Sequence, residues 1–345
     1  MKTTRIVSGQ ALLGEDLAVR PVDIVIEKGI ITSIEDNPHA PPVWICPAFF
    51  DAHTHLADTL AMDCKRTGNI VELVTPPNGL KHRVLAGASH DDLVAAMRAS
   101  IAGMISSGTF GCADFREGGI AGVRALMDAS YRLPFAPVIF GRDGGETKAP
   151  GLGISSTRDI PGVEKLVESA RTAGKMVAFH AGEQDADDVD TALSFDPDLL
   201  IHMTHATKEQ LRECADREIP IAVCPRSNWI LGVSSSADHP PLSIMLKLGC
   251  NVLLGTDNAM FVPPDMFSEM AFTATVYRVD PVTVLHAAVA GSVFCGSSFF
   301  IRKGARAVFF TLDPSHSAYR FSHDPVATLV NRAPAHEIGN NVFNL

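Results

Sequence analysis

Residues 45–55 read ICPAFFDAHTH, an apolar run that ends abruptly in polar residues. The apolar part, Ile45–Phe50, predicts a short buried strand. Residues two apart on a strand share a face, so we expect His53 and His55 to point the same way. Two imidazoles at the end of a buried strand fit a metal site, although an isolated H-x-H is more often a surface or core pair. The rest of the chain decides between these two interpretations.

Seven further apolar runs follow, and segments with helical patterning separate most of them. We place the eight strands near residues 45–52, 109–114, 135–140, 152–155, 176–180, 199–203, 219–224 and 251–256. The helix after Ser89, for example, has Asp91 and Asp92 in its first turn and ends near Gly108. Strands that alternate with helices in this way predict a parallel sheet with right-handed crossovers. Eight such units predict an α/β fold, a (β/α)₈ TIM-like barrel of about 250 residues.

The two ends of the 345-residue chain have a different pattern. Short apolar runs there are predicted as strands: Ile6–Val7, Val22–Ile26, Ile30–Ile34, Ala307–Thr311, Val326–Val330 and Val342–Phe343. A hairpin turn is expected at residues 27–29. We therefore predict a small β-sandwich domain from residues 1–46 and 301–345, beside a catalytic barrel over residues 47–300. This division accounts for the roughly one hundred residues by which the chain exceeds a plain barrel.

Polar residues follow several of the predicted strands, at the carboxyl edge where barrels of this type carry their chemistry. The fifth strand ends in FHAGE, which holds His180 and Glu183. The sixth strand is followed by His202 and His205, and the eighth by Asp257. One such residue alone is weak evidence, because a carboxylate after a strand is most often a helix cap. Together they predict a site for one divalent ion with an open position for water, with Zn²⁺ preferred over Fe²⁺.

The composition excludes several classes of protein. Apolar residues make up 46% and charged residues 20%, which excludes a disordered chain. The formal net charge is -10, and no basic run occurs, so nucleic acid and anionic membranes are not expected as partners. The seven cysteines form no C-x-x-C pair and are expected to be reduced thiols. With no signal-like N-terminus and no long apolar run, we expect a cytoplasmic protein, whose homo-oligomerisation stays open.

Five motifs resemble those of the amidohydrolase superfamily, in the branch that holds cytosine, S-adenosylhomocysteine and guanine deaminases and chlorotriazine hydrolases. They are PAFFDAHTHLADTL at 47–60, FHAGE at 179–183, HMTHAT at 202–207, CPRSN at 224–228 and LGTDNA at 254–259. Their order and spacing also match. KGARAVFFTLDP at 303–314 and HDPVATLVNRA at 323–333 resemble the segments that follow the barrel in that family. The resemblance therefore spans essentially the whole chain.

The resemblance implies roles for the residues at the strand ends. The ligands of one divalent metal would be His53, His55, His180 and Asp257. Such a metal lowers the pKa of its bound water to about 7, and Asp257 would accept the proton that this water loses. His205 would hydrogen-bond the water and the developing oxyanion. Glu183 would pass a proton to the ring nitrogen beside the attacked carbon.

Other polar residues have less defined roles. Candidates for contact with substrate are Arg116, Arg142, Arg226, Asn228 and Trp229. Their ordinary alternatives are exposed loop arginines and a packed tryptophan. We expect His202 and Asp51 to support the site from behind, while Asp58 either faces substrate or caps the first loop. Binuclear relatives carry a carboxylated lysine at the fourth strand; we interpret Lys148 as a loop lysine, so that the site holds one metal.

The resemblance implies a metal-dependent hydrolase of carbon–nitrogen bonds other than peptide bonds. The leading prediction is deamination of an aminated heterocycle, such as a nucleobase or nucleoside, by metal-bound hydroxide. Its partners would be this small molecule and water. Two alternatives stay open: a hydrolase of a cyclic amide or of a halide or alkylamine ring substituent, and a non-catalytic binding protein. The second alternative predicts the loss of a ligand or of Glu183, and the sequence retains them all.

Overall fold

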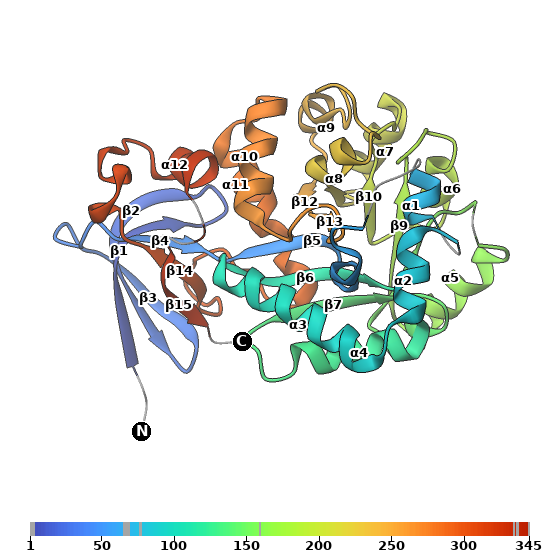
Figure 1. Cartoon of the computed structure of the whole chain (residues 1–345). Coiled ribbons are helices and arrows are strands. Elements are labelled where there is room, and N and C mark those ends of the chain that lie inside the picture. The colour runs from blue at the N-terminus through green and yellow to red at the C-terminus, as the bar shows by residue number, and fades with distance from the viewer. Residues whose placement is uncertain are drawn as a thin grey trace.

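The computed structural model describes residues 4–64, 70–75, 78–158, 160–333, 335 and 338–343. Two sheets organise these residues, a parallel sheet of nine segments and a six-stranded sheet that lies beside it (Figure 1). Helices surround the parallel sheet, which curls into a barrel. The predicted (β/α)₈ TIM-like barrel with a flanking sheet is therefore confirmed.

The barrel strands lie close to the positions that the apolar runs predicted. They are β5 (Phe49–His55), β6 (Thr109–Arg116), β7 (Ala136–Gly141), β8 (Gly151–Ile154), β9 (Met176–Ala181), β10 (Leu199–His202), β11 (Ile221–Val223), β12 (Val252–Leu254) and β13 (Asp257–Asn258). The segments β12 and β13 are two halves of the eighth strand. Because β12 pairs with β11 and β13 pairs with β5, this strand closes the barrel.

Helices follow most of the barrel strands along the chain. They are α1 (Ile70–Val74), α2 (Leu80–Gly87), α3 (His90–Ser106), α4 (Gly119–Ser130), α5 (Val163–Thr172), α6 (Val189–Ser194), α7 (Lys208–Asp216), α8 (Pro225–Ile230), α9 (Leu242–Leu248), α10 (Met266–Tyr277) and α11 (Pro281–Ala290). Ser89 and Thr207 each form a capping box, with Asp92 and Gln210 respectively. Within the described part of the chain, none of the helices combines the length and apolar character needed to cross a bilayer.

The connection between β7 and β8 departs from the strand–helix alternation. Residues 142–150, all of them described, contain only the three-residue 3-10 turn η2 (Gly145–Thr147). The barrel therefore carries no α-helix between α4 and α5, and this part of its outer layer is thinner than in a regular (β/α)₈ repeat.

The flanking sheet joins the two ends of the chain. Its order is β15-β14-β4-β1-β2-β3, with β1 (Thr4–Leu13), β2 (Ala18–Glu27), β3 (Ile30–Asp36), β4 (Trp44–Pro47), β14 (Val308–Leu312) and β15 (Ile338–Phe343). The expected hairpin turn joins β2 and β3, with Lys28 and Gly29 at φ 51° and 80°. Residues 304–307 hydrogen-bond back to the start of β3, so the sheet curls around a core that includes Ile24 and Phe309.

One predicted strand of the C-terminal flank is wrong. Val326–Val330 lies in the helix α12 (Pro325–Arg332). Asp324 caps this helix by accepting a hydrogen bond from the Ala327 amide (3.0 Å), and Pro325 occupies its first turn, where proline is favoured. The apolar residues of this short run face the core at helical spacing. The division at residues 46–47 and 300–301 stays a prediction.

Barrel closure depends on a buried carboxyl group. Asp51, fully buried in β5, accepts hydrogen bonds from the amide (2.9 Å) and the hydroxyl (2.6 Å) of Thr256, which lies between β12 and β13. Burial raises the pKa of Asp51 to about 7. Beside it, a Cβ on Gly255 would lie 2.8 Å from Cβ of His53, so glycine is what allows the two strands to approach. Asp51 thus binds the residue that directly precedes Asp257.

Replacing this carboxyl group tests the closure. Asp51→Ala leaves the Thr256 amide buried without an acceptor, and we expect the free energy of unfolding to fall by about 3 kcal/mol. Asp51→Asn keeps an oxygen for that amide and should cost less than half as much. Urea denaturation of both variants measures the difference. An equal loss in the two variants would show that charge, rather than the hydrogen bonds to Thr256, matters at this position.

Candidate metal centre and active site

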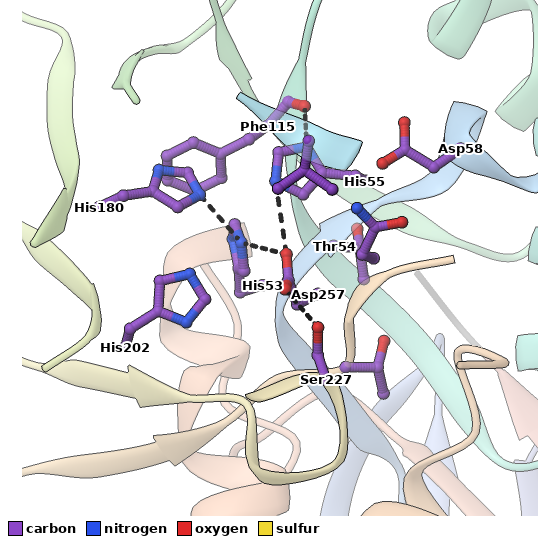
Figure 2. Close-up of polar contacts among 12 residues, drawn as sticks. His53, Thr54, His55, Asp58, Phe115, His180, His202, Ser227 and Asp257 are labelled. Atoms are coloured by element: carbon purple, nitrogen blue, oxygen red, sulfur yellow. Dashed lines mark hydrogen bonds and ion pairs between the residues drawn. The ribbon is translucent and has the colours of Figure 1, made fainter. Parts of the chain in front are cut away.

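The four predicted metal ligands come together at the carboxyl edge of the barrel (Figure 2). His53 and His55 extend from β5, His180 from β9 and Asp257 from β13. Nε2 of His53 lies 3.1 Å from Oδ1 of Asp257 and 3.2 Å from Nε2 of His180. Nε2 of His55 lies 3.5 Å from the same Asp257 oxygen. All four side chains are buried, so the residues form one compact cluster.

The protonation pattern of this cluster fits a bound cation. Nδ1 of His55 faces two acceptors, the Phe115 carbonyl (3.1 Å) and Oε1 of Glu117 (2.8 Å), so Nδ1 carries the hydrogen. Its Nε2 therefore presents a lone pair to Asp257, which is an acceptor too. Two buried acceptors facing each other repel unless a cation lies between them. The donor set, imidazole nitrogens and a carboxylate, suits a divalent metal.

Burial also prepares the imidazoles for this role. It lowers the pKa of His53 to about 4 and that of His55 to about 3. It likewise brings the pKa of His180 well below its usual value, with the charge of Arg142 as the second cause. All three rings are therefore neutral at pH 7, as metal ligation requires.

A buried charged network holds His55 from behind. Glu117, which follows β6 directly, receives the His55 Nδ1 hydrogen and also contacts Nζ of Lys81 (3.0 Å) and a guanidinium nitrogen of Arg116 (2.6 Å). Lys81 in turn lies 3.0 Å from Oδ2 of Asp58. Burial raises the pKa of Glu117, but Lys81, His55 and Arg116 outweigh it and hold this pKa well below its usual range. Asp58 is thus a buried partner of Lys81 in this network.

His202, rather than His205, lies beside the cluster. Its ring centroid is 5.8 Å from that of His53 and 5.4 Å from that of His180. The backbone explains the placement, because His202 and Met203 have φ values of 72° and 50°, which bend the chain at the end of β10. Such left-handed conformations cost about 1–3 kcal/mol each outside glycine and cluster at functional sites. The structure therefore places His202 where the sequence led us to expect His205.

His205 turns away from the cluster after this bend. Its Nε2 lies 3.2 Å from the Val233 carbonyl, and its ring lies 4.7 Å from that of His239. These contacts join the segment after β10 to the segment after α8, outside the group of ligands.

Asn228 orients His202. This fully buried amide donates to the Thr204 hydroxyl (2.8 Å) through Nδ2, which leaves its Oδ1 to accept from Nδ1 of His202 (3.2 Å). The lone pair of His202 Nε2 then points into the site, where Oε1 of Glu183 lies 3.7 Å away. Asn228 therefore lies behind His202 and outside the pocket lining, and its contact with substrate stays a prediction.

Glu183 lies at the edge of the cluster, as the sequence predicted. Gly182, with φ 64°, turns the chain after β9 and so brings Glu183 beside His202 although it lies three residues after His180. Its side chain keeps 23% of its surface exposed. Burial raises the pKa of this carboxyl group above its usual value. A raised pKa favours the protonated form of this carboxyl group, which is the form that can donate a proton.

A pocket of about 350 Å³ opens over the cluster, and we call it the metal pocket. Its lining includes His180, Glu183, His202 and the cationic side chains of Lys81, Arg142 and Arg158. Arg142 places a terminal nitrogen 3.1 Å from Nδ1 of His180, which also faces the Ile154 carbonyl at 3.0 Å. Among the described residues the Nε of Arg142 is buried without a hydrogen-bond partner. Arg142 is thus the predicted substrate contact that the structure brings to the site.

The remaining candidates lie elsewhere. Nε of Arg226 donates to Glu269 (2.6 Å) and Nε1 of Trp229 donates to the Tyr277 hydroxyl (2.9 Å), so both residues tie α8 to α10. Arg116 is 1% exposed and belongs to the network around Glu117. Lys148 is exposed in the loop before β8. These residues lie outside the lining of the metal pocket.

Sequence reasoning missed three residues that support the ligands. Ser227 donates to Oδ2 of Asp257 (2.6 Å) and so directs Oδ1 toward the cluster. It lies in the CPRSN motif, which was a usable signal. Glu117 follows a predicted strand end and was a second signal, whereas Lys81 lies in α2 and nothing in its local sequence points to the site.

Comparison with known proteins agrees with this geometry. Residues 44–159 match the family model for the amidohydrolase family, and residues 148–296 match the model for adenosine deaminase. A protein of Methanothermobacter thermautotrophicus named "Putative aminohydrolase" is 32% identical, over 96% of this chain and 95% of its own length.

Solved structures share the fold. Atrazine chlorohydrolase from Arthrobacter aurescens, complexed with zinc, superposes with a TM-score of 0.82 at 16% identity, over 98% of this chain and 93% of that one. An adenosine deaminase from Xanthomonas campestris with bound zinc gives a TM-score of 0.78 at 16% identity, over 98% and 91%. Both are similar in fold across essentially the whole chain.

The role of Glu117 can be tested through metal affinity. Glu117→Gln keeps the shape of the side chain but weakens the acceptor for His55, and we expect the affinity for zinc to fall about 10- to 100-fold. Competition with a chromophoric chelator measures this change. Glu168→Gln, at an exposed site on α5, is the matched control. Unchanged zinc affinity in Glu117→Gln would mean that the network serves stability only.

Proposed function

The chain belongs to the amidohydrolase family, and on this premise we propose that it is a zinc-dependent aminohydrolase that releases ammonia from an aminated heterocycle. The observation that carries the proposal is the position of Glu183 and His202 together at the edge of the ligand cluster. Glu183 can exchange protons with a ring nitrogen, while His202 hydrogen-bonds the attacking oxygen. Three imidazoles and one carboxylate suit Zn²⁺, and Fe²⁺ is the alternative.

The proposed ligands are His53, His55, His180 and Asp257. A divalent ion held there would supply a water molecule that is ready to attack at neutral pH. Asp257, fixed by Ser227 through one oxygen, would accept the proton that this water loses. Barrel closure through Asp51 and Thr256 keeps Asp257 next to β5 for both tasks.

His202 takes the role that the resemblance assigned to His205. Because Asn228 binds the hydrogen of Nδ1, Nε2 is an acceptor that can receive a hydrogen bond from the attacking water. If the ring becomes protonated, the same nitrogen donates to the oxyanion that develops on the substrate. The strained backbone at residues 202–203 keeps the ring in this position.

Glu183 completes the proton balance. In its protonated form it donates to the ring nitrogen beside the attacked carbon, which makes that carbon more electrophilic. The attacking oxygen would then bond to this carbon. The amino group would take the proton held by Asp257 and leave as ammonia as its carbon–nitrogen bond breaks, and the new hydroxyl would return a proton to Glu183 as the carbonyl forms. Arg142, which lines the metal pocket, would offer its guanidinium group to an acceptor atom of the ring. The substrate in this proposal is a small heterocycle, with water as the second reactant.

Glu183→Gln tests the reaction. We expect kcat to fall about 10²- to 10⁴-fold, the usual contribution of a general acid–base group, while the zinc content stays the same. Ammonia release from aminated purines, pyrimidines and pterins is the assay, and Glu164→Gln on the exposed face of α5 is the control.

Two results would count against the proposal. Full turnover by Glu183→Gln would remove the proton-transfer role of this residue. A zinc-loaded protein that releases ammonia from none of these compounds, but hydrolyses a cyclic amide or releases halide from a ring, would favour the alternative hydrolase.

A further inference from the structure

A second and larger cavity adjoins the metal pocket. Its volume is about 740 Å³, and we call it the side chamber. Arg142 and Ser155 line both cavities and so form part of the wall that the two share. The other walls of the side chamber come from α2, α3, α4 and α5 and from the carboxyl ends of β6, β7 and β8.

The side chamber exists because the chain is short and glycine-rich around it. The β7–β8 connection carries only the η2 turn, and four residues of this connection line the cavity: Arg142, Asp143, Gly144 and Glu146. At the start of α4, Gly118 and Gly122 also form part of the wall. A Cβ on Gly122 would lie 1.9 Å from the Glu117 carbonyl, so glycine is required for this approach.

The chemistry of the side chamber differs from that of the metal pocket. Its lining is mainly aliphatic, with Leu85, Leu93, Met97, Leu152, Ile154 and Leu166 among its residues. Arg116 and Arg142 also reach it and pair with Glu117 at 2.6 Å and 3.4 Å, whereas Asp143 and Glu146 lie on the side formed by the β7–β8 connection. The aliphatic part of the wall suits an apolar occupant.

We infer that the side chamber receives an apolar substituent of the substrate whose amino-bearing ring lies in the metal pocket; this rests on the proposed function. The metal pocket, at about 350 Å³, is at the lower end of the usual range for ligand sites and has room for a single ring system. A substituent directed past Arg142 would enter the side chamber. The guanidinium group of Arg142, which lines both cavities, would lie near the point where ring and substituent join. The substrate class is therefore an aminated heterocycle that carries several apolar carbon atoms.

A series of metal-anchored probes tests the side chamber without knowledge of the substrate. Straight-chain hydroxamates from acetohydroxamate to hexanohydroxamate bind a divalent metal through their two oxygens and differ only in the length of the alkyl chain. Calorimetric titration of the zinc-loaded protein gives the dissociation constants of acetohydroxamate and hexanohydroxamate, and the ratio of the two measures the effect of chain length. We expect affinity to rise with length, by up to about fourfold for each methylene group that is buried.

Two variants place bulk in the side chamber from opposite walls. Ala121→Trp on α4 and Ala86→Trp on α2 both start from exposed alanines that line it. Each should abolish the gain with chain length, whereas Met127→Trp, an exposed α4 residue outside the lining, should preserve it. The test compares the ratio of the acetohydroxamate and hexanohydroxamate dissociation constants within each protein. A variant that weakens the binding of both compounds equally leaves this ratio unchanged.

The outcomes separate this inference from the proposed reaction. A flat series in the unmodified protein, including one without binding, overturns the inference, and so does a length dependence that survives both tryptophan variants. If the length dependence appears as expected but no aminated heterocycle releases ammonia, the side chamber stands and the proposed reaction is wrong.

Discussion

The buried convergence of His53, His55, His180 and Asp257 is the constraint on which the rest of the site depends. Because His55 and Asp257 present lone pairs to each other away from water, the arrangement is costly without a cation between them. Several neighbouring interactions maintain it. Asp51 binds Thr256 and thereby holds the eighth strand against β5, Ser227 fixes Asp257, and Glu117 fixes the tautomer of His55. The barrel closure and the metal cluster are thus parts of the same structure.

The geometry also explains how one site can combine two kinds of chemistry. Towards the centre of the barrel, the donor groups suit a cation, and burial keeps the imidazoles neutral. At the rim, Glu183 lies beside His202, and Arg142 lines the pocket with its guanidinium group. The thin outer layer at the β7–β8 connection then gives the site a second, aliphatic cavity next to the first. The side chamber borders the β7–β8 connection, where a regular repeat would carry a helix.

Most of the fold could be predicted from the sequence because buried parallel strands are apolar runs, and their polar endings meet at one edge of a barrel. The same logic predicted the four residues that lie together in the cluster, and Glu183 at its edge. It did not anticipate that His202, rather than His205, lies beside the cluster, because this placement depends on left-handed backbone angles at residues 202 and 203. The contact of Asn228 with His202 was not foreseen, since the two residues follow different strands. The apolar run Val326–Val330 suggested a strand, although the preceding Asp324–Pro325 pair favours a helix start.

The central claim is that the cluster binds one divalent metal through these four side chains. The most direct measurement is anomalous diffraction from zinc-loaded crystals, recorded above and below the zinc absorption edge. The account predicts one anomalous peak per chain, within about 2.0–2.2 Å of Nε2 of the three histidines and Oδ1 of Asp257. It predicts none near Lys148. A peak elsewhere, a second peak of equal height beside the first, or none at the cluster would contradict it.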